Sequence, residues 1–80
     1  MEKIYRQDIE NEELFVDDTV EVVREEEERI NNSDYNFCSV GKQGKVVEMG
    51  FCIHGVNVEF QTSQGLRKIE CSMKNLKKIS

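Results

Sequence analysis

Alternation of apolar and polar residues predicts strands along most of the chain after residue 18. In "VNVEF", residues 56–60, apolar side chains occupy every second position, which is typical of a strand with one buried face. "LRKIECSM" places Ile69, Cys71 and Met73 on one face in the same manner. The β-branched run "TVEVV", residues 19–23, predicts a further strand. Together these segments favour an all-β fold.

Glycines mark the turns between the predicted strands. In "GKQGKVVEM", Gly41 and Gly44 flank two polar residues, and we expect both to take positive φ in a turn that precedes the strand "KVVEM". We expect Gly50 to form a bulge or bend inside one long strand that continues through "FCIH", with the next turn at His54 and Gly55. "TSQG" predicts a hairpin turn before the strand that follows.

The sequence changes character at residue 15. In residues 1–14 the apolar residues Ile4, Ile9 and Leu14 are irregularly spaced, so we expect a flexible or short helical segment at the periphery. Residues 15–80 are expected to form the folded domain, because a chain of 80 residues has room for one.

Two connections complete the predicted order of elements. "REEEERINNSDYNF" follows the first predicted strand and reads as a long acidic loop at residues 24–36. "KNLKKI" is too short for a regular α-helix, so we expect a 3₁₀ turn at residues 73–76 and a short closing strand that buries Leu76 and Ile79.

This order resembles the small five-stranded SH3-like barrel, and in particular the KOW-like modules of transcription elongation factors and ribosomal proteins. The matching pieces are "DTVEVV", "GKQGKVVEM", "VNVEF" and "IECSMKNLKKI", within residues 18–79. The predicted core consists of apolar residues assigned to the barrel interior: Val20, Val22, Val46, Met49, Ile53, Val56, Val58, Phe60, Leu66, Ile69, Cys71, Leu76 and Ile79.

Composition places the chain among small acidic proteins with unevenly distributed charge. The net charge is −5, yet residues 1–36 hold four basic and thirteen acidic residues, whereas residues 37–80 hold seven basic and three acidic ones. No apolar run reaches the roughly 20 residues that a membrane span needs, and the N-terminal sequence lacks the pattern of an export signal. We expect a cytoplasmic protein of a bacterium, phage or other mobile element, present as a monomer or weak dimer.

Catalytic and metal chemistry find little support in the sequence. Cys52 and His54 would share a strand face, but no third group orients them as a nucleophile and base. Cys38, Cys52, His54 and Cys71 are formally a zinc ligand set, but only the Cys52 and His54 spacing resembles the ligand pairs of structural zinc sites. We therefore expect neither an enzyme nor a metal or other cofactor.

A nucleic-acid-binding module is one alternative. Lys42 and Lys45 flank the glycine turn, where the resemblance to KOW-like modules implies contacts, and Arg67 and Lys68 add positive charge in the C-terminal half. Lysines on edge strands are also common devices against aggregation, and the acidic chain as a whole would repel phosphates.

Protein recognition is the function that the sequence favours. Acidic and aromatic residues meet in the long loop 24–37, where carboxylates steer a basic or proline-rich peptide and aromatic rings anchor it. The residues expected to bind a protein partner are Glu25, Glu26, Glu27, Glu28, Tyr35 and Phe37. A second alternative is an acidic inhibitor that mimics nucleic acid.

Overall fold

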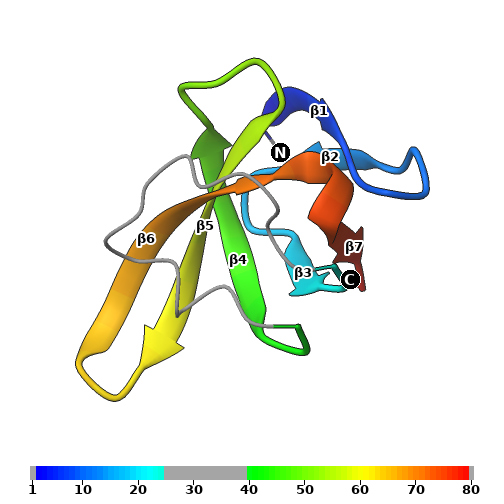
Figure 1. Ribbon diagram of the computed structural model, residues 1–80. Helices are drawn as coiled ribbons and strands as arrows, with labels where there is room; N and C mark the ends of the chain where they lie inside the picture. The colour runs from blue at the N-terminus through cyan, green and yellow to red at the C-terminus, as the bar shows by residue number, and fades with distance from the viewer. Residues whose placement is uncertain (1, 25–39, 80) are drawn as a thin grey trace.

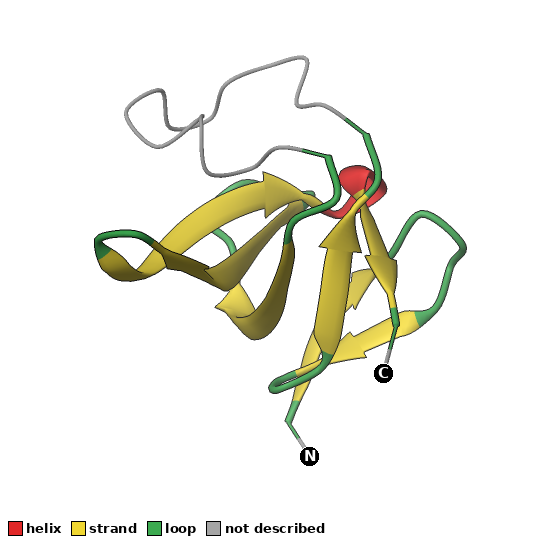
Figure 2. Ribbon diagram, turned by 90° about the horizontal axis from the view of Figure 1, so that it is seen from below, coloured by secondary structure: helices red, strands yellow, loops and turns green. Residues whose placement is uncertain are grey.

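The computed structural model describes residues 2–24 and 40–79, and most of them lie in strands (Figures 1 and 2). The described part contains no α-helix, so the all-β prediction is confirmed. A 3₁₀ turn at Met73–Asn75 precedes the last strand, as the sequence predicted. The strands are β1 (Lys3–Gln7), β2 (Glu13–Phe15), β3 (Thr19–Val22), β4 (Gln43–Met49), β5 (Gly55–Thr62), β6 (Gly65–Ser72) and β7 (Leu76–Lys78).

The strands form two antiparallel sheets. β1 and β2 make a two-stranded sheet, and the other five follow the order β6-β5-β4-β3-β7. β4, β5 and β6 are therefore a meander, and β7 returns to pair with β3 on its far side. Within the described residues no pairing joins β6 to β7, so the structure shows an open five-stranded sheet.

The core is built from the alternate side chains of the meander and from both ends of the chain. Val46, Val58 and Ile69 occupy neighbouring positions across β4, β5 and β6, and each is buried. Burying one such side chain contributes about 1.5–3 kcal/mol. The buried apolar residues are Ile4, Leu14, Val20, Val22, Val46, Val56, Val58, Phe60, Ile69, Cys71 and Leu76.

Four residues predicted for the core are exposed instead. Met49 is the last residue of β4, and although it pairs with buried Val56, its side chain is 50% exposed at this end of the strand. Leu66 pairs with Gln61 on the outer face, the opposite face from Ile69. Ile53 lies in the turn before β5 and Ile79 follows β7, so neither has a strand neighbour to cover it.

The bend predicted at Gly50 is also in a different place. The register irregularity lies within β4, and the strand ends at Met49 rather than continuing through residues 51–54. Gly50 begins a turn that runs to Gly55, the first residue of β5. Residues 50–55 are called the apolar turn below.

The two glycines before β4 have separate roles. Gly41 has φ +96 and open space around it, which agrees with the predicted turn. Gly44 lies inside β4 without a positive φ, and a Cβ there would come within 2.6 Å of the Glu59 carbonyl oxygen and 2.9 Å of the Phe60 ring. The prediction for Gly44 was therefore wrong, because its missing side chain permits close strand packing.

The N-terminal segment is a hairpin rather than a flexible or helical extension. Ile4 on β1 and Leu14 on β2 are buried in the common core. Tyr5 and Asn11 have positive φ, and the β1–β2 register shifts between Lys3 and Gln7. These irregularities remove the two-residue period, so the sequence pattern gave no sign of the strands.

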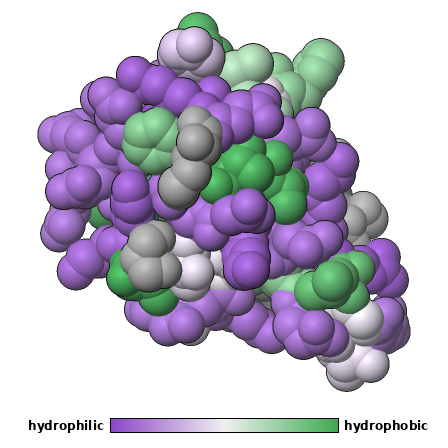
Figure 3. All heavy atoms as spheres, turned by 180° about the vertical axis from the view of Figure 1, so that it is seen from behind, coloured by the Kyte–Doolittle hydropathy of each residue, from purple (hydrophilic) through white to green (hydrophobic). Residues whose placement is uncertain are grey.

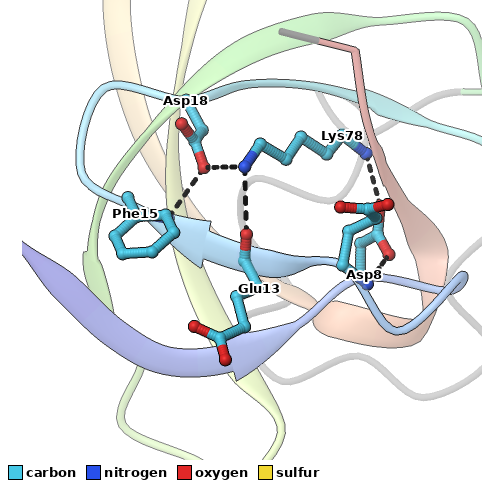
Figure 4. A network of polar contacts seen from close by, with 6 residues as sticks. Asp8, Glu13, Phe15, Asp18 and Lys78 are labelled. Carbon is cyan, nitrogen blue, oxygen red and sulfur yellow. Dashed lines mark hydrogen bonds and ion pairs between the residues drawn. The ribbon is translucent and has the colours of Figure 1, made fainter.

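Two buried aspartates attach this hairpin to the last strand (Figure 4). Asp8 accepts hydrogen bonds from the backbone amides of Glu10, Glu12 and Lys78, at 2.8, 2.9 and 2.7 Å. The Lys78 ammonium lies 3.2 Å from the Asp18 carboxylate. β7 thus holds the N-terminal hairpin through both the backbone and the side chain of Lys78.

Candidate functional site

The apolar turn exposes more apolar side chain than any comparable stretch of the described residues. Phe51 is 96% exposed and Ile53 79%, and Met49 just before the turn is 50% exposed. The turn forms one end of the molecule, at the top of Figure 1, and apolar atoms are visible at that end in Figure 3. Single exposed apolar residues are ordinary, whereas several adjoining ones often mark an interaction surface.

Backbone hydrogen bonds hold the apolar turn in one conformation. The Gly50 amide donates to the Gly55 carbonyl and the Gly55 amide donates to the Cys52 carbonyl, both at 2.9 Å. The Met73 amide donates to the His54 carbonyl at 2.8 Å, which attaches the turn to the 3₁₀ turn. Phe51 and Ile53 are therefore presented from an ordered backbone.

The Glu70 side chain supports the apolar turn from β6. Its Oε2 accepts a hydrogen bond of 2.7 Å from the Cys52 amide. The carboxylate lies against Gly50 and Gly55, where an added Cβ on either glycine would overlap it. Two glycines at the ends of the turn thus make room for the carboxylate that caps it.

Arg6 joins the apolar turn to β1. Its Nε donates to the Gly55 carbonyl at 3.1 Å and its Nη2 to the Cys52 carbonyl at 3.2 Å, while Nη1 contacts the Tyr5 carbonyl at 3.1 Å. The ion pairs among the described residues do not include Arg6. Among the described residues, its charge is therefore solvated by carbonyl dipoles and meets no carboxylate.

A groove of about 410 Å³ lies between β1 and the apolar turn. Tyr5, which is 75% exposed, and Ile53 are among its apolar side chains. Lys3 Nζ lies 3.0 Å from a Glu13 carboxylate oxygen and 5.6 Å from the centre of the Tyr5 ring. The groove is lined by Lys3, Tyr5, Arg6, Gln7, Glu13, Ile53, His54 and Met73.

The backbone at Tyr5 is strained. Its φ of 60 lies in the left-handed region, which a bulky side chain adopts only at a cost of about 1–2 kcal/mol. Arg6 and the β1–β2 pairing hold this conformation on either side. Such strain is concentrated at binding and active sites, and here it directs an exposed aromatic ring to the groove.

The cysteines do not form a reactive or metal-binding group in the described residues. Burial, followed by the neighbouring Glu70 charge, raises the pKa of the Cys52 thiol, which disfavours the nucleophilic thiolate. Cys71 is buried in the core and pairs with Val56 across the sheet. No cluster of three metal-binding side chains occurs in residues 2–24 and 40–79, and Cys38 lies outside them.

The residues considered for nucleic-acid binding are not brought together on one surface. Lys45 and Lys68 lie on the outer face of the sheet on either side of Glu59, whereas Arg67 takes the opposite face at the position of Phe60. Lys42 precedes β4 and is half-buried.

One of these lysines already has an acidic partner. Lys68 Nζ donates a 2.7 Å hydrogen bond to Glu48, which lowers the Glu48 pKa and raises that of Lys68. The pair is exposed on both sides, so its charges are screened and it stabilises the fold little.

The residues predicted to bind a protein partner, Glu25 to Glu28, Tyr35 and Phe37, lie outside the described residues. The sequence reasoning missed Tyr5, considered Phe51 only as a ring that could stack on nucleic-acid bases, and assigned Ile53 to the core. A usable signal was present, since "GFCIHG" has its apolar residues confined between two glycines, as expected for a turn.

Comparison of the chain with protein-family models, curated proteins and solved structures finds no match. Its function therefore has to be argued from the geometry described above. The described part of the chain holds no helix with the length and apolarity needed to cross a membrane.

Proposed function

We propose that this chain is a non-catalytic, SH3-like interaction module that binds a protein partner through the apolar turn, residues 50–55. The strand order supports the SH3-like assignment, because a meander is followed by a 3₁₀ turn and by a last strand that pairs with β3, the strand that precedes the meander. This binding surface differs from the segment 24–37 that the sequence favoured, most of which lies outside the described residues.

The observation that carries this proposal is the 96% exposure of Phe51 on a turn whose backbone is fixed. Leaving a large aromatic ring in water forgoes about 1.5–3 kcal/mol of burial energy, which contact with a partner recovers. Aromatic side chains dominate the energetics of many interfaces, and a fixed backbone reduces the entropy that binding costs.

Affinity capture with matched variants tests the proposal. The immobilised full chain is incubated with a lysate of the organism that encodes it, with and without nuclease. We expect a protein to be retained by the wild type and lost with the double variant Phe51→Ala and Ile53→Ala. Leu66→Ala is the control, because Leu66 is 61% exposed but lies on β6, outside the turn.

The same experiment distinguishes the competing functions. Retention that disappears after nuclease treatment would favour the nucleic-acid-binding alternative. Retention of a protein that is equal for the wild type and the double variant would show that the apolar turn is not the binding surface.

A further inference from the structure

We infer that the groove between β1 and the apolar turn binds an extended peptide segment in which an acidic side chain adjoins a large apolar one. This inference rests on the proposed protein-binding function and specifies the chemistry of the partner. It follows from three features of the groove, namely its apolar walls, its uncompensated positive charge and its fixed conformation.

The walls of the groove offer apolar contact. Tyr5 and Ile53 are 75% and 79% exposed, and Met73, the first residue of the 3₁₀ turn, also lines the groove and is half-buried against the core. A volume of about 410 Å³ accommodates a few side chains and not a folded domain. A short segment carrying one large apolar residue therefore suits the space.

The charges of the groove favour an acidic group beside that residue. Lys3 is paired with Glu13, which leaves the charge of Arg6 without a carboxylate among the described residues. A guanidinium has more N–H donors than the three that Arg6 gives to carbonyl oxygens, so donors remain for a partner. A carboxylate that meets a partly buried guanidinium forms a strong, charge-assisted hydrogen bond.

Other polymers fit these features less well. A nucleic-acid backbone needs a row of cations at the spacing of its phosphates, whereas Lys3 and Arg6 are the cations that line the groove and Lys3 is paired with Glu13 in the described part of the chain. A basic peptide would be repelled by Arg6 and would find only Glu13, which Lys3 already neutralises. An acidic and apolar peptide satisfies both the walls and the charge.

The groove is also prepared for binding. Arg6 is fixed by two carbonyl groups of the apolar turn, and the strained backbone of Tyr5 holds its ring at the groove. Little side-chain or loop ordering would then be needed when a peptide binds, which preserves affinity in a small contact.

Selection from a displayed library of random heptapeptides tests this inference, with the full chain as bait. We expect the enriched peptides to carry Asp or Glu next to Phe, Leu, Ile or Trp. A synthetic copy of an enriched peptide, blocked at both ends, should bind about tenfold more weakly when its acid is replaced by the amide.

Variants of the protein locate the binding. Lys3→Glu reverses a charge at the groove and leaves the Arg6 contacts in place. It should therefore weaken binding of the acidic peptide about tenfold. Tyr5→Ala should also weaken binding of the peptide, because it removes an aromatic ring from the apolar wall of the groove. Leu66→Ala should leave binding unchanged, and amide spectra of each variant report whether it is folded.

Three results would overturn the inference. They are enrichment of peptides that lack acids, binding that Lys3→Glu and Tyr5→Ala leave unchanged in folded protein, and displacement of the peptide by a single-stranded oligonucleotide. Enrichment of neutral or basic peptides whose binding requires Phe51 would refute the inference but retain the proposed function. Absence of any enriched peptide, together with failure of the Phe51-dependent capture, would refute both.

Discussion

Gly41 and Gly44 flank the same short turn, yet each is required for a different physical reason. Gly41 has a positive φ, which residues other than glycine, Asn and Asp rarely adopt, and there is open space around it. Gly44 has an ordinary strand conformation but is pressed against the backbone and side chains of β5. The first glycine is needed for its φ, and the second for its small volume.

Replacing each glycine by asparagine separates these two requirements. Gly41→Asn should change the free energy of unfolding by less than about 1 kcal/mol, because Asn tolerates positive φ. Gly44→Asn should lower it by about 2 kcal/mol or more, because the new side chain cannot fit without moving a backbone carbonyl. Urea unfolding followed by circular dichroism measures both, and equal losses would contradict the distinction.

At the scale of elements, polar contacts with β7 attach the N-terminal hairpin to the larger sheet, in addition to the apolar contacts of Ile4 and Leu14 in the core. Asp8 is buried and accepts three backbone amides, including that of Lys78. The Ile9 amide donates to the Leu76 carbonyl at 2.9 Å, and the Lys78 ammonium lies 5.3 Å from the centre of the Phe15 ring. The hairpin and β7 therefore depend on one another.

Asp8→Ala should lower the free energy of unfolding by about 2–3 kcal/mol, because it removes a buried carboxylate that accepts three partly buried amide donors. The Lys78 amide should then exchange its hydrogen faster with solvent, which NMR measures. Glu10→Ala is the matched control, since Glu10 is exposed and its contact with Lys77 is 3.9 Å, so a change within about 0.5 kcal/mol is expected. Equal effects of the two substitutions would contradict the role given to Asp8.

The elements also show how far sequence reasoning reaches. β3, β5 and β6 were predicted because each contains a stretch in which apolar residues alternate with polar ones, as Val56, Val58 and Phe60 do in β5. β1 and β2 were missed because a bulky residue at positive φ and a register shift break the alternation. The apolar turn was misjudged for a related reason. An exposed isoleucine such as Ile53 looks the same in the sequence as a buried one, and only the three-dimensional path of the chain shows which of the two it is.

At the scale of the whole molecule, both sheets contribute side chains to one core. Ile4 and Leu14 belong to the same cluster of buried residues as Val58 and Phe60. A chain of 80 residues has a stability of only about 5 kcal/mol or somewhat more, so the N-terminal contribution is a large share of it. We therefore expect the described residues to unfold as one cooperative unit.

Leu14→Ala tests this cooperativity. The substitution should remove about 3 kcal/mol, because it leaves a cavity beneath the hairpin. Amide signals of Ile4 on β1 and of Val58 on β5 should lose intensity at the same, lower urea concentration. Ile9→Ala should have a smaller effect, because Ile9 is 37% exposed. Loss of the Ile4 signal alone would indicate that the hairpin unfolds independently.

The anchoring of the first strands by Lys78 sets an order of events during synthesis. Translation produces Asp8 and Asp18 long before the lysine that completes their environment. Until Lys78 has emerged from the ribosome, β7 cannot pair with β3. The N-terminal hairpin then lacks the contacts with β7 that stabilise it. The nascent polypeptide should therefore stay sensitive to proteases until residue 78 has left the exit tunnel, and then become resistant in a single step.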